Sequence, residues 1–206
     1  GLFYPPDPAS LRQSTLGGNV AECAGGPRAF KYGTTKRYVL ALEAVLPTGE
    51  IIHTGSKAVK NVVGYDLTQL LVGSEGTLAI ITEITVRLIP QPAARGVLLA
   101  EFADISHGVD AVTKLIERRV VPGAVEIVDA ASLDALAAHT GRAVASAGSG
   151  AVLIVEVDGP PDTVGLELSL VEDACRAAKA IVVRRAASEA QREDIWHVRR
   201  ELSAAL

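Results

Sequence analysis

The stretch STLGGNVAECAGGP, residues 14–27, decides the fold. It places two Gly-Gly pairs, Gly17-Gly18 and Gly25-Gly26, close behind the hydroxyls of Ser14 and Thr15. Glycine has no Cβ, so backbone of this kind can approach a flat or anionic ligand closely and direct N–H groups at it. A glycine-rich turn without any ligand explains the same composition. No Gly-Lys-Ser/Thr follows, so the segment is not a Walker loop. It also lacks the glycine spacing of a dinucleotide-binding helix start.

A second glycine element, VGSEGTLAIIT at residues 72–82, follows a short predicted helix. Asp66 is a suitable N-cap for a helix over residues 67–72, and Gly73 can end that helix in the left-handed conformation. The alternation of apolar and polar residues from 78 to 89 predicts one half-buried strand. Alone, this element reads as a connector between a helix and a strand.

The chain changes character near residues 91–94, where Gln-Pro-Ala-Ala separates a Gly-rich half from a half with Ala-rich helical stretches. We therefore expect two domains, residues 1–92 and 93–206. In the first, two β-prone runs at 39–46 and 51–54, joined by Pro-Thr-Gly, predict a hairpin. In the second, strands alternate with helices, which is the ferredoxin-like plan of two split βαβ units. Its strands are expected at residues 97–102, 124–128, 151–157 and 181–183.

Two helices of the second half are predicted to face the core with apolar stripes at spacings of three and four. The stripes comprise Ile105, Val109, Val112 and Ile116 in the first helix and Val164, Leu168, Val171, Cys175 and Ala178 in the second. In a last helix, about residues 189–206, Trp196, Arg199 and Ser203 share one face. The opposite face, which we expect to point to the core, carries Ile195, Val198, Leu202 and Leu206.

The 206 residues are 49% hydrophobic and 21% charged, with a net charge of -4. This composition excludes a disordered chain and argues against nucleic acid or an anionic membrane as the main partner. No apolar run is long enough for a membrane span, and no targeting signal is visible. Two cysteines are too few for a disulfide framework. Because the sequence contains no methionine, we expect an internal piece of a longer polypeptide.

The ordered set of motifs resembles the FAD-linked oxidases of the vanillyl-alcohol oxidase and p-cresol methylhydroxylase (PCMH) type. It is most similar to the D subunit of glycolate oxidase and to D-lactate or D-2-hydroxyglutarate dehydrogenases. The matching segments are YPPDP (4–8), the loop 14–26, KYG (31–33), LPTGE (46–50), NVVGYDL (61–67), GSEGTLAIIT (73–82), LIP (88–90), LIVEVDG (153–159) and IWHVRRE (195–201). The resemblance covers essentially the whole chain and is strongest over residues 4–90.

The resemblance implies an α+β chain in which the later half of a PCMH-type FAD-binding domain precedes a truncated, ferredoxin-like FAD-linked oxidase C-terminal (cap) domain. Reduction of a flavin places negative charge on its N1 and C2-carbonyl side, which fixed N–H donors stabilise. The family's own pyrophosphate-binding subdomain has no counterpart in this sequence. The residues assigned to the FAD pocket are Pro5, Ser14, Thr15, Gly17, Gly18, Asn19, Ala21, Gly25, Gly26, Glu75, Gly76, Ile80 and Ile81.

The same resemblance gives Arg199 the role of binding the substrate carboxylate, with the hydroxyl of Ser203 beside it. The implied reaction is oxidation of a D-2-hydroxy acid, such as glycolate or D-lactate, to the 2-keto acid. A base removes the hydroxyl proton as hydride passes to flavin N5. No catalytic base is assigned in this sequence. No metal site is assigned either, since the histidines lack ligand spacing: His53, His107, His139 and His197.

Other implications concern the protein's surroundings. The resemblance points to a bacterial flavoprotein that passes electrons to a separate acceptor, such as an iron–sulfur subunit, in the cytoplasm or peripherally at the inner membrane. One alternative is a non-catalytic FAD-binding or structural subunit of a glycolate oxidase-type complex. Another is an oxidoreductase of the same fold acting on an alcohol or a sugar nucleotide. Cys23 could attach flavin covalently, although a small free cysteine filling a packed loop is the common case.

Overall fold

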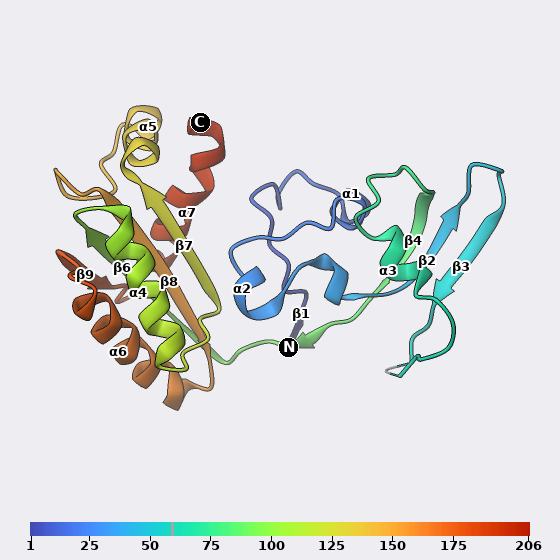
Figure 1. Ribbon diagram of the computed structural model, residues 1–206, viewed down its shortest axis with the longest axis horizontal. Helices are drawn as coiled ribbons and strands as arrows, with labels where there is room; N and C mark the ends of the chain where they lie inside the picture. Colours follow the sequence, from blue (N-terminus) through green and yellow to red (C-terminus); the bar gives the residue numbers. More distant parts are fainter. Residues whose placement is uncertain (59) are drawn as a thin grey trace. The chain divides into compact units, whose positions relative to one another are not determined.

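The computed structural model of this protein describes residues 1–58 and 60–206; within this part the side chains of Val198 and Ser203 are left undescribed. The chain divides into two compact units, Gly1–Gln91 and Pro92–Leu206. Figure 1 shows both units, and each is treated separately here. Among the described helices, none combines the length and the apolar character that crossing a bilayer requires.

Unit 1 is built from short elements around a three-stranded antiparallel sheet of order β3-β2-β4. A two-stranded sheet pairs β1 with β5. The elements are β1 (Leu2–Phe3), α1 (Leu16–Ala21), α2 (Ala29–Tyr32), the 3₁₀ helix η1 (Thr35–Arg37), β2 (Val39–Val45), β3 (Ile51–Gly55), α3 (Leu67–Leu71), β4 (Ile80–Val86) and β5 (Ile89–Pro90).

The predicted hairpin and the predicted short helix of unit 1 are confirmed. Strand β2 pairs with β3 antiparallel, and the Asp66 side chain caps α3 by accepting from the amide of Gln69. The prediction of one strand from 78 to 89 is wrong in its second part. Strand β4 ends at Val86, and Ile89 pairs with Phe3 of β1 instead. The alternation continues through Leu88, beyond the end of β4, but the pairing partner changes, and the pattern of a single strand cannot reveal that change.

The core of unit 1 joins the glycine segments to the sheet. Helix α1 contributes Val20, which is 0% exposed, and the end of α3 contributes Leu71 and Val72. These side chains pack with Leu42 and Ala44 of β2. The first glycine segment and the chain leading into the second are therefore fixed on one side by apolar packing.

Unit 2 contains a four-stranded antiparallel sheet of order β7-β8-β6-β9. Two strand–helix–strand units, β6-α4-β7 and β8-α6-β9, interleave in this order, so the ferredoxin-like prediction is confirmed. Helix α5 is inserted between β7 and β8, and α7 follows β9. The elements are β6 (Ala94–Phe102), α4 (Ile105–Glu117), β7 (Ala124–Asp129), α5 (Ala130–Thr140), β8 (Ala151–Gly159), α6 (Pro161–Ala177), β9 (Val182–Arg185) and α7 (Glu189–Ala205).

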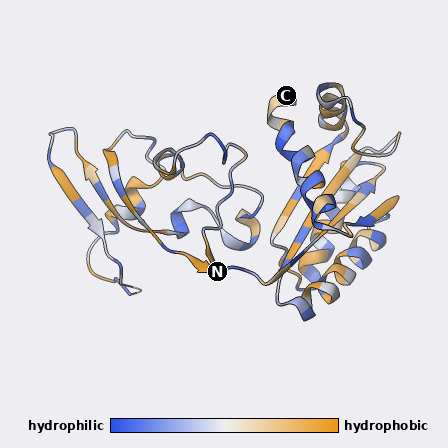
Figure 2. Ribbon diagram, turned by 180° about the vertical axis from the view of Figure 1, so that it is seen from behind, coloured by the Kyte–Doolittle hydropathy of each residue, from blue (hydrophilic) through white to orange (hydrophobic). Residues whose placement is uncertain are grey.

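Both faces of this sheet are covered by helices. Helices α4 and α6 pack on one face, around Leu98, Phe102 and Val155. Helices α5 and α7 cover the other face, around Leu99 and Ile154 (Figure 1). Strands buried on both sides read as almost continuous apolar runs, and the central strands are accordingly hydrophobic in Figure 2. A carboxylate inside such a strand is therefore unusual.

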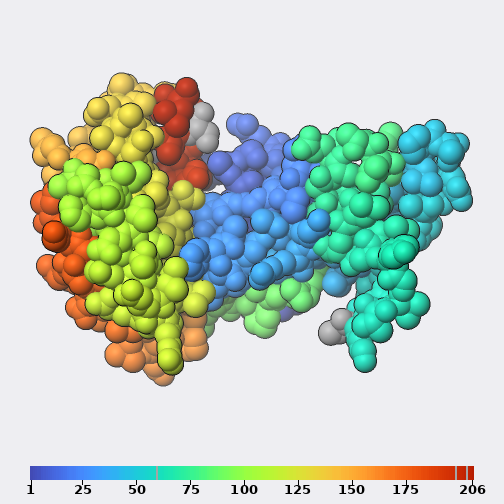
Figure 3. Space-filling view, viewed as in Figure 1, coloured from blue at the N-terminus to red at the C-terminus, as the bar shows by residue number. Residues whose placement is uncertain are grey.

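The predicted core-facing stripe of α4 is wrong for three of its four residues, whereas Val112 packs against the core. Ile105, Val109 and Ile116 are 46%, 54% and 57% exposed, whereas Gly108 and Ala111 face the sheet. The sheet-facing side of α4 also carries Leu115, which is 1% exposed, and a Cβ added at Gly108 would lie 2.6 Å from the Ile127 Cδ1. Figure 3 shows α4, in yellow-green, on the surface of its unit. The stripe predicted for α6 is confirmed, with Val164, Val171, Cys175 and Ala178 buried and Leu168 packed against the same core.

Candidate functional site

The first glycine segment forms a short helix rather than the open loop that its composition suggested. The Thr15 side chain accepts from the amide of Gly18 at 3.0 Å and so caps α1. Behind the helix, the amide of Ala24 donates to the carbonyl of Asn19 at 2.8 Å and turns the chain. Gly17 and Gly18 therefore lie in the first turn of α1.

The second glycine segment is hydrogen-bonded to the end of this helix. The Gly73 amide donates to the carbonyl of Val20 at 3.0 Å, and the Glu75 amide donates to the carbonyl of Ala21 at 2.9 Å. The structure thus brings together two predicted parts of the FAD pocket that are far apart in the sequence. Within unit 1, residues 14–21 and 73–76 form one backbone cluster, which we call the glycine cluster.

The backbone in and beside the glycine cluster is strained. Glu75 has a φ of 54° and Cys23, just after α1, a φ of 53°, although neither is glycine. Such conformations cost about 1–3 kcal/mol each and collect at ligand-binding positions. Cys23 also packs closely on Gly73, since a Cβ added at Gly73 would lie 3.0 Å from the Cys23 Cβ. The Cys23 thiol contacts the Thr34 hydroxyl at 3.4 Å, as expected of a cysteine in a packed loop.

The glycine cluster contains two buried hydroxyls and two glycines with open space beside them. The Ser14 Oγ and Ser74 Oγ are buried and have no hydrogen-bond partner among the described residues. Buried polar groups are normally paired, so each hydroxyl is free to bond a water molecule or a ligand. A Cβ at Gly17 or at Gly76 would meet nothing within 4 Å, which leaves room for a molecule against the backbone.

The other residues predicted for the FAD pocket differ in their surroundings. Ile80, at the start of β4, is 70% exposed beside the cluster, whereas Ile81 packs against the unit 1 core. Pro5 is buried. Gly25 and Gly26 lie against residues outside the glycine cluster. A Cβ added at Gly25 would contact Thr34 and Ala29, and one added at Gly26 would clash with Asp7.

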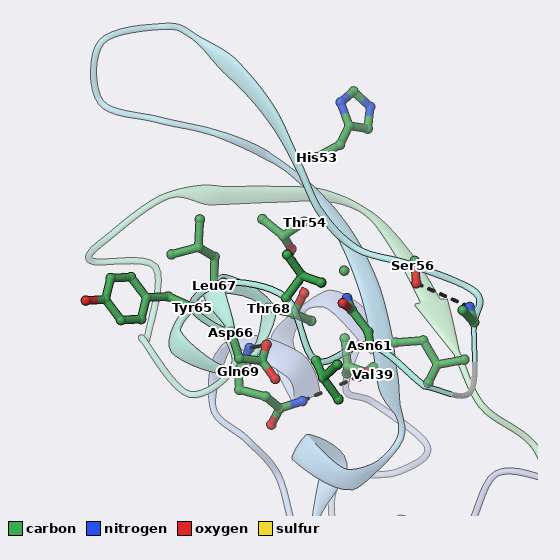
Figure 4. Close-up of a pocket in the computed structure, with 16 residues that line it drawn as sticks. Val39, His53, Thr54, Ser56, Asn61, Tyr65, Asp66, Leu67, Thr68 and Gln69 are labelled. Atoms are coloured by element: carbon green, nitrogen blue, oxygen red, sulfur yellow. Dashed lines mark hydrogen bonds between the residues drawn. The ribbon is translucent and has the colours of Figure 1, made fainter.

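Unit 1 also has a cavity of about 430 Å³ beside the hairpin, and its described lining includes none of the predicted site residues. Figure 4 shows Thr54 and Thr68 facing each other in it, and their hydroxyls are 2.8 Å apart. The motif segment 61–67 forms one wall. The Gln69 side chain also lines the cavity, and its amide donates to the carbonyl of Lys36 at 3.0 Å.

In unit 2, helix α7 contacts one strand after another of the sheet. At its start, Arg95 of β6 donates to Glu189 at 2.5 Å. Near the middle of the helix, the Trp196 indole N–H donates to Glu156 of β8 at 2.8 Å. Burial alone would lower the pKa of Arg95, but Glu156, Glu189 and Glu193 raise it, so the arginine stays charged. The prediction that Trp196 faces away from the core is wrong, because its ring is 8% exposed and packs against the sheet.

Arg199 makes the last of these contacts between α7 and the sheet. Its Nη2 donates to Glu126 Oε1 of β7 at 3.0 Å, and the two side chains are 18% and 21% exposed. Its Nε is buried and has no partner among the described residues. Arg200 instead pairs with Glu193 at 3.5 Å on the more open side. Ser203 lies in α7, but its side chain is outside the described part of the structure.

Glu126 and Glu156, the two carboxylates that Arg199 and Trp196 contact, were not among the residues predicted for the site. Both sit in apolar strand sequences, VEIV and IVEV, on the face that α7 covers. A carboxylate within an apolar strand sequence has to find a hydrogen-bond donor, and that is the signal which could have identified them.

Comparison with known proteins agrees with both units. The family model for FAD linked oxidases, C-terminal domain, matches residues 91–206, and the model for an FAD binding domain matches residues 1–55. The glycolate oxidase subunit GlcD of Bacillus subtilis is 41% identical over 206 residues, which are 100% of this chain and 44% of that protein. A D-lactate dehydrogenase of Anaerostipes hadrus is 37% identical over 214 residues, again 100% of this chain and 44% of that one.

A solved structure of alkyldihydroxyacetonephosphate synthase has the same fold, with a TM-score of 0.75 at 23% identity. It covers 97% of this chain, which in turn covers 38% of that structure. The chain thus spans less than half the length of these relatives. The family model for the C-terminal domain nevertheless covers more than half of the chain. The chain therefore belongs to the FAD-linked oxidases, a family of oxidoreductases whose cofactor is FAD.

Proposed function

We propose that the full-length protein oxidises a small D-2-hydroxy acid, of the glycolate or D-lactate class, to the corresponding 2-keto acid. The observation that carries this proposal is the environment of Arg199, whose mostly buried guanidinium lies on the sheet of unit 2. Its Nε has no hydrogen-bond partner among the described residues. A guanidinium presents planar N–H groups that match a carboxylate. The names of two relatives, a glycolate oxidase subunit and a D-lactate dehydrogenase, support the same class of substrate.

In this proposal the glycine cluster of unit 1 holds FAD. Bound FAD supplies the acceptor for the hydride that leaves the substrate. The hydroxyls of Ser14 and Ser74 and the open backbone at Gly17 and Gly76 contact the cofactor. The remaining predicted pocket residues form its surroundings, Ile80 with an exposed apolar side chain and Pro5, Gly25 and Gly26 by supporting the chain around α1.

In unit 2, Arg199 binds and orients the substrate carboxylate, with the Ser203 hydroxyl beside it. Charge-assisted hydrogen bonds of this kind are roughly twice as strong as neutral ones and fix the orientation of the acid. The base that takes the hydroxyl proton is not assigned to any residue of this chain. In this proposal the base lies in the remainder of the full-length protein.

The proposal extends to the electron acceptor. Electrons leave the reduced protein to a separate acceptor, an iron–sulfur or other redox subunit, either in the cytoplasm or peripherally at the inner membrane. The Bacillus subtilis relative is named as a subunit of glycolate oxidase, which supports a partner of this kind.

The test is Arg199→Ala in the full-length protein. It should keep FAD and lose about 2–3 kcal/mol of transition-state stabilisation, roughly 30- to 150-fold in kcat/KM. Arg199→Lys should recover part of this loss, because lysine keeps the charge without the planar fork. Arg200→Ala is the matched control and should leave turnover nearly unchanged. Equal, near-normal kinetics for both alanine variants would show that Arg199 does not bind the substrate carboxylate, and a wild-type protein without hydroxy-acid oxidation would favour the non-catalytic subunit instead.

A further inference from the structure

Glu126 holds Arg199 from a strand whose position is fixed by the sheet. Its strand β7 pairs with β8 so that Glu126 stands opposite Ile154, which is 1% exposed. The Oε1 of Glu126 accepts from Arg199 Nη2 at 3.0 Å. The sheet thus sets the place of the carboxylate, and the carboxylate sets the place of one end of the guanidinium.

We propose that Glu126 is a positioning residue, which orients Arg199 for the carboxylate of the substrate. This inference rests on the function proposed above. An arginine side chain has many rotamers, and each must be restricted before a carboxylate can bind it in one geometry. Glu126 restricts them before the substrate arrives and occupies one edge of a group with five N–H donors. The Nε, unpartnered among the described residues, leaves a donor for a second carboxylate.

A negative charge beside Arg199 has a second effect, which opposes the first. Glu126 lowers the positive potential around the guanidinium and so competes with the substrate carboxylate. If competition dominated, any neutral replacement of Glu126 would tighten substrate binding. If positioning dominates, a replacement that keeps an acceptor oxygen in the same place preserves binding, and one that removes or moves it weakens binding. The fixed strand and the low exposure of both side chains favour positioning.

The experiment compares three variants of the full-length, FAD-loaded enzyme: Glu126→Ala, Glu126→Gln and Glu126→Asp. Kinetics with the hydroxy acid separate KM from kcat, and a titration with oxalate, which has no C–H bond to oxidise, reports binding through the flavin spectrum. Glu126→Ala should raise KM and the oxalate dissociation constant at least about tenfold, with kcat changed less than about threefold. Glu126→Gln should stay within about threefold of the wild type, because its amide oxygen still accepts from Nη2.

Glu126→Asp keeps the charge but withdraws the carboxylate, and it should raise KM at least about fivefold. This variant decides the question even if Glu126→Ala does not fold. A control is Glu193→Gln, which removes a different polar contact of α7, with Arg95 and Arg200, and should stay within about twofold. It shows whether loosening the helix in general has the same effect.

Combination with Arg199→Ala separates this inference from the function on which it rests. Adding Glu126→Ala to Arg199→Ala should change KM by less than about twofold, since a positioning residue acts only through its arginine. If Arg199→Ala is costly but both Glu126→Ala and Glu126→Asp are harmless, or if Glu126→Gln lowers KM, the positioning role is wrong and the arginine clamp stands. If Arg199→Ala itself has no effect, the proposed function fails. Additive effects of the two alanine substitutions would also overturn the positioning role.

Discussion

The backbone amide of Glu75 donates to the carbonyl of Ala21 across 2.9 Å, while Glu75 itself holds a φ of 54°. This contact makes the two glycine segments a single structural feature of unit 1. A substitution in one segment therefore disturbs the backbone of the other. The consequence can be measured at Gly73, which bonds directly to the end of α1.

Gly73→Ala should destabilise the full-length protein by about 2 kcal/mol, because alanine is disfavoured at positive φ and its Cβ presses on Cys23. The φ of Gly73 is 82°, and the added Cβ would lie 3.0 Å from the Cys23 Cβ. Urea unfolding followed by circular dichroism gives the loss. Gly49→Ala is the matched control, with a φ of 85° and nothing within 4 Å of the new Cβ. It should show the backbone cost alone, about 1 kcal/mol. Equal losses would mean that the contact with Cys23 does not matter.

Ser14→Ala and Ser74→Ala should leave the stability of the FAD-free protein unchanged or slightly higher, because each removes a buried hydroxyl without a partner among the described residues. FAD binding should nevertheless weaken about five- to tenfold for each, the loss of one hydrogen bond. Flavin fluorescence titration of the apoprotein measures this. Ser149→Ala should behave in the opposite way, since its hydroxyl donates to buried Glu101 at 2.8 Å in unit 2. It should lose stability and keep FAD affinity. Unchanged FAD affinity in both Ser14 and Ser74 variants would remove these hydroxyls from the cofactor site.

Glu101→Gln should destabilise the protein at neutral pH and matter progressively less in acid. Burial alone would raise the pKa of Glu101, but the Ser146 amide, the Ser149 hydroxyl and Arg184 together hold it below its ordinary value of 4.5. A carboxyl whose folded pKa is lowered stabilises the fold above its ordinary pKa, and that contribution disappears as pH falls from 4.5 through the lowered value. Urea midpoints at a series of pH values should therefore converge below pH 4.5. Exposed Glu117→Gln should show a small, constant offset, and a Glu101→Gln offset that is equally constant would contradict the argument.

Trp196→Phe should cost about 1.5–3 kcal/mol, because it takes a hydrogen-bond donor from a buried carboxylate. The indole N–H donates to Glu156, which is 2% exposed. Since Trp196 is the single tryptophan of the sequence, the variant has to be followed by circular dichroism rather than by tryptophan fluorescence. A cost below about 0.5 kcal/mol would show that the Trp196–Glu156 bond contributes no net stability.

The fold was predictable wherever large apolar residues mark the buried side. The stripe of α6 and the ferredoxin-like order of strands followed from the sequence for this reason. The face of α4 did not, because two of its three buried residues are Gly108 and Ala111, beside Leu115, while the larger Ile105 and Val109 are exposed. Periodicity of hydrophobicity gives little weight to glycine and alanine, yet close packing depends on them.

The candidate site was predictable as a set of motifs and not as a set of contacts. The glycine segments and Arg199 stood out through residue type and order. Their resemblance to a known family then identified FAD as the cofactor. The bonds from Gly73 and Glu75 to α1 depend on a chain reversal that no local pattern encodes. In the same way, the pairing of Arg199 with Glu126 depends on strand order, and the sequence separation of the two residues conceals it.

The polar contacts of α7 have a consequence for the order of folding. They come from β6, β8 and β7 in turn, through Arg95, Glu156 and Glu126. A strand rises about 3.3 Å per residue, so a two-residue slip between β7 and β8 would carry Glu126 about 7 Å away from Arg199. Helix α7 can satisfy all three contacts only after the three strands have reached their final alignment. We therefore expect α7 to dock late in folding, so that the emission of Trp196 follows the alignment of β6, β8 and β7 rather than the formation of one helix.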